Sequence, residues 1–188
     1  MEEIKHYFEQ HFGITSPDWD VFSSKLSQHC FPKKSVLLSQ GETENHLSFI
    51  SKGIVRQYVP LEDGEITFGF AFRGSFISAY DSFISRTPSN YVVETITETV
   101  LWQLTYDDLQ EVYKTSQIGD RIGRKASEEL FLKKSKRELS LLLDTAEERY
   151  LKLFTERPEL IREIPLKYVA SYIGVTPQAL SRIRKRIS

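Results

Sequence analysis

The sequence contains little cysteine and no long hydrophobic run. Its 188 residues include one cysteine, Cys30, so neither an intramolecular disulfide nor a cysteine-ligated zinc or iron–sulfur site can form within one chain. No two histidines have the i, i+4 spacing of a helical metal site, and we expect no metal and no cofactor. No apolar run reaches the length of a membrane span, and the first ten residues lack the apolar region of a signal peptide. These absences predict a soluble cytoplasmic protein without a membrane partner.

Common catalytic motifs are also missing. There is no GxSxG or HExxH motif, no Walker loop and no zinc-ligand spacing. The carboxylate pairs Asp63-Gly64-Glu65 and Glu147-Glu148 fall in an expected turn and on an expected solvated helix face. We therefore expect no catalytic residues and no enzymatic activity.

The net charge of -1 hides a strong asymmetry along the chain. Residues 1–115 hold 9 Lys and Arg against 16 Asp and Glu, a net charge of -7, whereas residues 116–188 hold 16 against 10, a net charge of +6. A basic segment attached to an acidic one indicates that the C-terminal part meets a polyanion.

Hydrophobic periodicity divides the chain into a helical start and a long β segment. Residues 1–28 have apolar residues at helical spacing, interrupted at Ser16-Pro17, where Ser16 is expected to cap a second helix. From Phe31 to Thr105, short β-prone runs are separated by glycines about ten residues apart, a spacing typical of a compact β-sandwich or barrel. We expect turns at these glycines, a hairpin formed by residues 54–60 and 65–72, and further strands at 91–96 and 100–104.

Two helices should follow the β segment. Thr105 is expected to cap a short helix, and residues 117–144 read as one long helix without proline. Its apolar stripe is either a dimer seam or a face that packs on its own domain, and the spacing leaves both open. As dimer-interface residues we expect Ile118, Ile122, Ala126 and Leu130.

The C-terminal 44 residues contain the most specific pattern. After a helix at 145–156, ended by Arg157-Pro158, two short helices are expected to cross at Ala170, with a tight turn at Gly174. Thr176 and Pro177 suit the start of the second helix, whose outward face is basic. This layout favours a DNA-binding helix-turn-helix, and a surface helical hairpin is the alternative. The expected DNA-binding residues are Thr176, Gln178, Ser181, Arg182, Arg184, Lys185 and Arg186.

The stretch Val169-Ala170-Ser171-Tyr172-Ile173-Gly174-Val175-Thr176-Pro177-Gln178-Ala179-Leu180-Ser181-Arg182-Ile183 resembles the recognition unit of the Crp/Fnr family of bacterial transcription regulators. The β segment resembles the family's cyclic-nucleotide-binding-like β-roll, and the order β-roll, long helix, helix-turn-helix also matches. The resemblance implies an α+β fold in three parts: a β-roll (jelly roll) sensor domain at 1–115, a long dimerisation helix at 116–144 and a DNA-binding domain at 145–188. It further implies a homodimer, a palindromic double-stranded DNA operator and RNA polymerase as a possible protein partner. In the family's geometry, Gln178 and Arg182 would read bases in the major groove.

The resemblance fails at the residues that bind cyclic nucleotides. In this fold a Gly-Glu pair and a later Arg-Ser or Arg-Thr pair hold the ribose and the phosphate, but here the positions fall on Ser78-Ala79 and near Ser89-Asn90. Neither Arg73 nor Arg86 matches, and only arginine contacts phosphate bidentately. We expect that cyclic AMP does not bind and that the effector is another, unknown molecule or none. The residues expected near any ligand are Phe76, Ser89, Asn90 and Tyr91.

Two functional hypotheses remain. The first is a sequence-specific DNA-binding regulator, which would contact DNA without a β-wing because the sequence ends at Ser188, directly after the second helix. The second is a β-roll ligand-binding or scaffold module that does not bind DNA. The basic face around Arg182 favours the first, because a scaffold would not need it.

Overall fold

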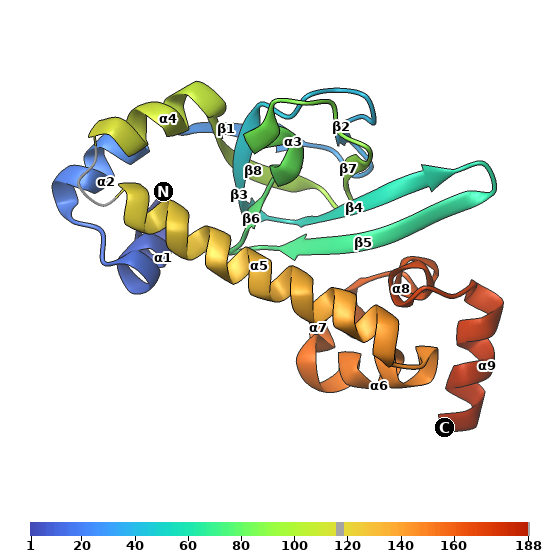
Figure 1. The fold of residues 1–188 in the computed structure, drawn as a ribbon. Helices are drawn as coiled ribbons and strands as arrows, with labels where there is room; N and C mark the ends of the chain where they lie inside the picture. The colour runs from blue at the N-terminus through green and yellow to red at the C-terminus, as the bar shows by residue number, and fades with distance from the viewer. Residues whose placement is uncertain (116–118, 188) are drawn as a thin grey trace. The chain divides into compact units, whose positions relative to one another are not determined.

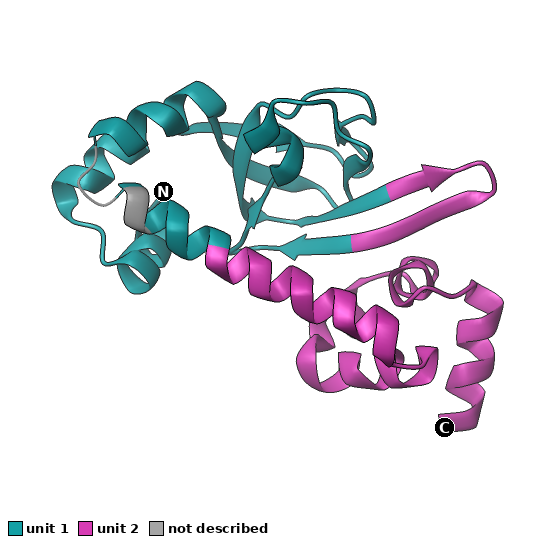
Figure 2. Cartoon of the chain, viewed as in Figure 1, with its two compact units in different colours: residues 1–58, 69–127 teal, residues 59–68, 128–188 magenta. Residues whose placement is uncertain are grey.

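The computed structural model describes residues 1–115 and 119–187, with the backbone alone for Asp120 and Arg121. Contacts divide the chain into two compact units (Figure 2). Unit 1 comprises residues 1–58 and 69–127, and unit 2 comprises residues 59–68 and 128–188. This division differs from the expected domain limits at 115 and 144. The boundary between the units lies within the long helix, after residue 127, and the tip of a β-hairpin, residues 59–68, is grouped with the C-terminal helices.

Unit 1 begins with two helices, α1 (Glu2–Phe12) and α2 (Ser16–Ser23). The apolar residues that predicted them face one cluster that is rich in aromatic rings. The cap of α2 differs from the prediction: it is Thr15, whose hydroxyl accepts the Asp18 N–H at 3.4 Å, and Ser16 is the first helical residue. The cap and the first helical residue therefore both lie one position earlier than expected, and Pro17 is the second residue of the helix.

The β segment folds into two antiparallel four-stranded sheets with strand orders β1-β8-β3-β6 and β2-β7-β4-β5 (Figure 1). The predicted hairpin and the two later strands are confirmed, and Gly53 and Gly64 have the positive φ angles that their turns require. The strands are β1 (Ser27–Phe31), β2 (Val36–Leu38), β3 (His46–Lys52), β4 (Ile54–Leu61), β5 (Gly64–Phe72), β6 (Phe76–Ile77), β7 (Val92–Thr95) and β8 (Thr99–Thr105).

Buried aliphatic side chains from both sheets fill the interior of the roll, including Ile50, Val55 and Leu101. The aromatic cluster beneath α1 and α2 forms a second apolar core in unit 1. Burial of this area supplies most of the driving force for folding this unit.

Two short helices flank the last strands. The helix α3 (Tyr80–Ser85), between β6 and β7, was not predicted, because six residues are too few to reveal a helical period. The helix α4 (Tyr106–Thr115) was predicted, and the Asp108 N–H donates to the hydroxyl of its cap Thr105 at 3.2 Å. The long helix is confirmed as α5 (Gly119–Leu143).

Unit 2 continues from α5 through four more helices. The helix α6 (Ala146–Glu156) starts with a reciprocal capping box between Thr145 and Glu148. Pro158, expected to end a helix, also begins the unpredicted α7 (Pro158–Glu163), because proline fits the first turn of a helix. The last two helices, α8 (Leu166–Ile173) and α9 (Pro177–Ile187), lie where the sequence placed them.

Candidate nucleic-acid interface and ligand pocket

The turn between α8 and α9 has the geometry that the sequence predicted. Gly174 ends α8 in the left-handed conformation at φ 80°, and the Val175 N–H donates to the Ala170 carbonyl at 3.0 Å. Ala170 is fully buried, and Ile173 and Leu180 are buried beside it. A small residue at the crossing and an apolar seam therefore fix α9 against α8.

The N-terminus of α9 is capped but carries no acidic residue. The hydroxyl of Thr176 accepts the Ala179 N–H at 3.2 Å, as expected of a helix cap, and Pro177 is the first helical residue. The first turn holds no Asp or Glu, so the positive end of the helix dipole is not neutralised by a side chain of its own turn. This end is suited to meet an anion.

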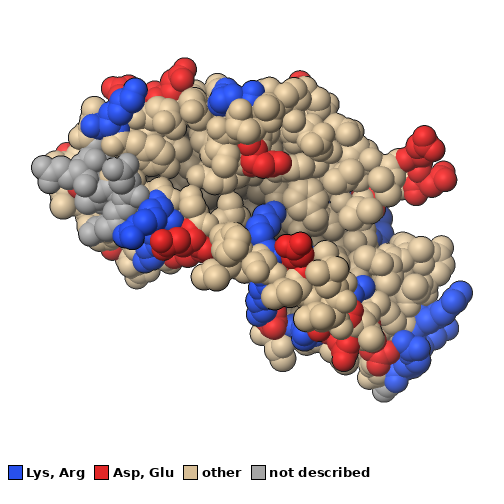
Figure 3. Space-filling model, in the orientation of Figure 1, with Lys and Arg blue, Asp and Glu red and all other residues tan. Residues whose placement is uncertain are grey.

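All seven predicted DNA-binding residues are exposed, and they lie on or directly before α9. Among the residues that the structure describes, no hydrogen bond or ion pair engages the side chains of Gln178, Arg182 or Lys185. Arg186 differs, because its guanidinium pairs with Glu147 at 2.6 Å. Figure 3 shows Lys and Arg side chains gathered over α9. The helix therefore presents a cationic, hydrogen-bonding face.

Two arginines that sequence reasoning missed hold the C-terminal end of α8. Arg149 Nε donates to the Ile173 carbonyl at 2.8 Å, and Arg137 donates to the Tyr172 carbonyl while its guanidinium lies 4.0 Å from the centre of the Tyr172 ring. Burial lowers the pKa of Arg137 from its ordinary value, and the neighbouring charges of Arg149 and Arg157 act in the same direction. Cations at the C-terminus of a helix are favourable, so both arginines stabilise the turn into α9.

The four residues predicted for the dimer interface have different surroundings along α5. Ile118 lies outside the described residues, and Ile122 packs against the aromatic cluster of its own unit. Further along, Ala126 is exposed and Leu130 is half-buried. Towards the end of α5, large apolar side chains outside the four predicted interface residues are exposed: Phe131, Leu132, Leu139, Leu141, Leu142 and Leu143.

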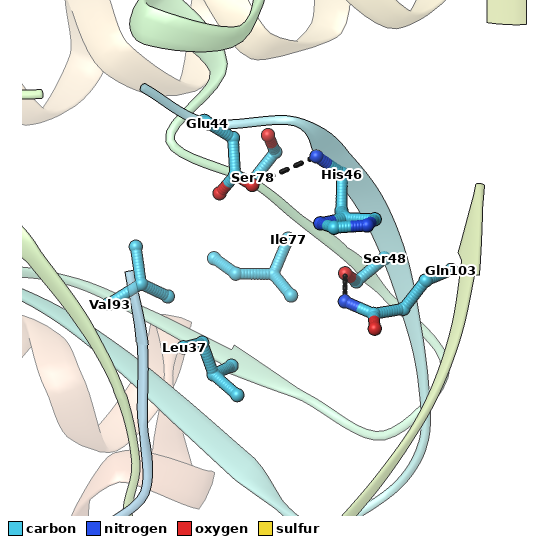
Figure 4. Close-up of a pocket in the computed structure, with 8 residues that line it drawn as sticks. All are labelled: Leu37, Glu44, His46, Ser48, Ile77, Ser78, Val93 and Gln103. Carbon is cyan, nitrogen blue, oxygen red and sulfur yellow. Dashed lines mark hydrogen bonds between the residues drawn. The ribbon is translucent and has the colours of Figure 1, made fainter. Parts of the chain in front are cut away.

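A small pocket lies inside the β-roll (Figure 4), and its lining differs from the four residues expected there. Phe76 instead packs against the aromatic cluster, with its ring centre 5.2 Å from that of Phe49. The Ser89 hydroxyl donates to the Tyr91 carbonyl at 2.9 Å, and Asn90 is exposed. The lining residues are Leu37, Glu44, His46, Ser48, Ile77, Ser78, Val93 and Gln103.

Tyr91 does not line this pocket either, because its hydroxyl donates to the Asp81 carboxylate. Burial raises the pKa of the Tyr91 phenol, and the hydrogen bond and negative charge of Asp81 raise it further. The phenol therefore stays protonated and acts as a hydrogen-bond donor within the protein.

Glu44 is the charged group at the rim of this pocket. It is buried, and its carboxylate accepts the backbone N–H groups of Asn45 at 3.0 Å, His46 at 2.9 Å and Ala79 at 3.2 Å. Ala79 is the residue that caps α3, so an internal carboxylate already occupies the start of that helix. Sequence reasoning missed Glu44, because it comes from the loop before β3 and nothing local links it to α3.

The two arginines compared with the phosphate-binding position are both engaged. Arg86 donates to the Glu44 carbonyl at 2.6 Å and to Asn45 Oδ1 at 2.9 Å, and Arg73 pairs with Glu3 at 3.0 Å. The Ser78 hydroxyl is buried and has no hydrogen-bond partner within the described part of the chain. The pocket is therefore polar, but its one fixed charge is negative.

Comparison with known proteins agrees with this architecture. Residues 28–116 match the family model of the cyclic nucleotide-binding domain. No curated protein matches the chain significantly in sequence. Within the described residues, no helix is long and apolar enough to cross a membrane, and no group of His, Cys, Asp and Glu is arranged to hold a metal ion.

Three solved structures resemble nearly the whole chain. A transcriptional regulator from Eubacterium rectale, assigned to the Crp/Fnr family, has a TM-score of 0.75 at 16% identity and covers 97% of this chain and 87% of its own. The c-di-GMP-responsive global regulator CLP of Xanthomonas campestris has a TM-score of 0.73 at 18% identity, covering 92% and 91%. FixK2 of Bradyrhizobium japonicum has a TM-score of 0.71 at 18% identity, covering 86% and 84%.

These identities establish the fold alone. The expected fold class is confirmed: an α+β chain with an N-terminal β-roll of the cyclic nucleotide-binding type and a set of C-terminal helices, as in Crp/Fnr-type regulators. Four-fifths or more of each of these three chains is covered, so the match extends well beyond the β-roll.

Proposed function

We propose that this chain is a sequence-specific DNA-binding transcription regulator of the Crp/Fnr type. The observation that carries the proposal is the exposed cationic face of α9, on a helix fixed by Ala170 and the Gly174 turn. Arg182 and Gln178 lie four residues apart on this face, and their side chains can pair bidentately with guanine and adenine. Arg184, Lys185 and Thr176 contact phosphates in this arrangement and contribute affinity without sequence information.

The similar structures support this assignment. The Xanthomonas protein is named a global regulator and the Eubacterium protein a transcriptional regulator, and both cover most of this chain. In the proposed mechanism α9 enters the major groove as a recognition helix, while α8 crosses the backbone. The chain performs no reaction of its own, and RNA polymerase is the protein partner that such a regulator would contact.

The regulator acts as a homodimer in this proposal. The exposed apolar residues of α5 supply the seam, because Leu132 and Leu139 are one heptad apart and Leu142 lies three residues further, an a–a–d pattern. A two-fold axis along α5 would place two recognition helices one turn of DNA apart, about 34 Å. The operator is therefore palindromic.

The sensor domain has lost cyclic-nucleotide binding in this proposal. A cyclic phosphate that approached the Ala79 N–H would meet the buried Glu44 carboxylate, and the nearby Arg86 guanidinium is already hydrogen-bonded to the Glu44 carbonyl and to Asn45. The effector, if one exists, is an uncharged or weakly polar molecule.

Selection of bound sequences from a random double-stranded DNA pool tests the proposal. Enrichment of an inverted repeat whose half-site centres are about 10 base pairs apart is the expected result. The variant Arg182→Ala should lose enrichment at one base of each half-site. If the wild-type chain enriched no sequence from the pool, sequence-specific DNA recognition would be refuted. The alternative, a β-roll ligand-binding or scaffold module that does not bind DNA, would then be favoured.

A further inference from the structure

The tip of the hairpin between β4 and β5, residues 59–68, belongs to the same compact unit as α8 and α9 (Figure 2). Two hydrogen bonds join it to α8 at one side chain. The Thr67 N–H donates to the Ser171 hydroxyl oxygen at 2.7 Å, and the Ser171 hydroxyl donates to the Glu65 carbonyl at 2.9 Å. Thr67 is 1% exposed, and Ser171 and Glu65 are half-buried.

A third contact lies at the base of the tip. The Lys134 ammonium of α5 lies 4.9 Å from the centre of the Phe68 ring, within the range of a cation–π interaction. The tip is therefore held at α8 and at α5 within one unit. Because β4 and β5 continue into the sheet of unit 1, the same hairpin is covalently part of the sensor roll.

The tip carries charge of one sign. Glu62, Asp63 and Glu65 lie within four residues, and residues 59–68 contain no Lys or Arg. Glu62 and Asp63 are exposed. Figure 3 shows the acidic side chains projecting at the turn, apart from the Lys and Arg side chains that gather over α9.

Ser171 shares a face of α8 with an exposed cation. Lys167 and Ser171 are four residues apart, so they share one face of the helix, and Lys167 is exposed. In a helix-turn-helix the first helix crosses the DNA backbone, and Lys and Ser side chains are common phosphate partners. If α8 crosses the DNA backbone as proposed, the acidic tip is docked on the face that phosphates would approach.

We infer that the hairpin tip is an autoinhibitory latch that competes with the DNA backbone for α8. The inference rests on the proposed function. In the latched state the Ser171 hydroxyl is occupied by the tip, and the tip carboxylates repel phosphates. DNA binding requires the tip to leave, so any change in the sensor roll that moves the hairpin changes DNA affinity.

The first test removes the tip charges and leaves Ser171 in place. The variant Glu62→Gln/Asp63→Asn should bind duplex DNA about three- to tenfold more tightly at low salt, and the gain should shrink as salt screens the charges. The matched control Glu9→Gln/Asp20→Asn removes the same charge from exposed positions on α1 and α2, and it should change affinity less than twofold. Equal gains in the two variants would overturn the latch, since net charge alone would then explain them.

The second test follows the latch itself by amide exchange of Thr67, resolved by NMR of the full chain. Ser171→Ala should speed Thr67 exchange about fivefold in the free protein, as expected for loss of one hydrogen bond, whereas Ser181→Ala on α9 should not. Adding duplex DNA to the wild-type chain should also speed the amide exchange of Thr67, because the tip would leave α8. Unchanged Thr67 protection in the DNA complex would overturn the latch while leaving DNA binding intact.

A wild-type chain that binds no DNA in either test would refute the proposed function itself, and the latch with it.

Discussion

Arg182 and Lys185 are exposed cations on the same helix, yet we expect them to contribute differently to DNA binding. Arg182→Ala should cost about 1–3 kcal/mol on the cognate site and relax the preference at one base pair, because a bidentate contact to a base is lost. Lys185→Ala should weaken binding to all sequences alike and reduce the salt-dependence slope by roughly one, because one phosphate contact is lost. Anisotropy titrations with cognate and scrambled duplexes over a salt series measure both effects.

The two variants serve as controls for each other. If Arg182→Ala kept both affinity and sequence preference, α9 would not be the base-reading helix. If Lys185→Ala changed preference instead, the two roles would be exchanged along the helix.

The role of Gly174 can also be isolated by a single substitution. Its φ of 80° is in the left-handed region, and a Cβ built there meets only Arg149 Nη2, at 3.7 Å. Gly174→Ala should therefore destabilise the α8–α9 turn by backbone strain alone, about 1–2 kcal/mol, without a steric clash.

The measurement is the shift in urea midpoint followed by circular dichroism, with Ser181→Ala on the exposed face of α9 as the control that should leave the midpoint unchanged. A wild-type midpoint for Gly174→Ala would show that the turn does not need the left-handed conformation.

At the scale of elements, α5 has two apolar parts with different surroundings. Ile122 packs on the core of unit 1, whereas Leu139 and Leu142 are 53% and 74% exposed. We predict that Leu139→Ser/Leu142→Ser converts the proposed dimer to a monomer at micromolar concentration, because the proposed seam loses its apolar area. Sedimentation velocity measures the change.

The matched control is Ile84→Ser on α3, which is 56% exposed and lies away from the helix seam in sequence and element. It should leave the dimer intact. A wild-type chain that sediments as a strict monomer would contradict the dimer altogether, and a dimer that survives the double substitution would move the seam elsewhere.

At the scale of the whole molecule, a fold of the cyclic nucleotide-binding type has a buried carboxylate, Glu44, where it would repel the negative charge of a cyclic phosphate. We predict no micromolar or tighter binding of cyclic AMP or cyclic GMP, because the Ala79 N–H is engaged by Glu44 and the Arg86 guanidinium is engaged by the loop before β3. Isothermal titration calorimetry of the full chain measures this. A micromolar dissociation constant for either nucleotide would contradict this prediction and would show that a phosphate can replace Glu44 as the partner of the Ala79 N–H.

Local patterns in the sequence determined most elements of this protein. The hairpin of β4 and β5, the Thr105 cap and the α8–α9 turn all depend on residues a few positions apart, and each was predicted. Even the errors were local: the cap of α2 moved from Ser16 to Thr15, because both hydroxyl residues suit that position.

Only the tertiary structure decided which polar and apolar groups meet. The Glu44 carboxylate reaches Ala79, Arg149 reaches the Ile173 carbonyl, and Ser171 is bonded to Thr67, across 35, 24 and 104 positions of sequence. It also decided that Ile122 faces its own unit while Leu142 does not. The physical reason is that caps, turns and helical faces follow from backbone preferences within a few residues, whereas these pairings depend on how separate elements pack, which no local periodicity encodes.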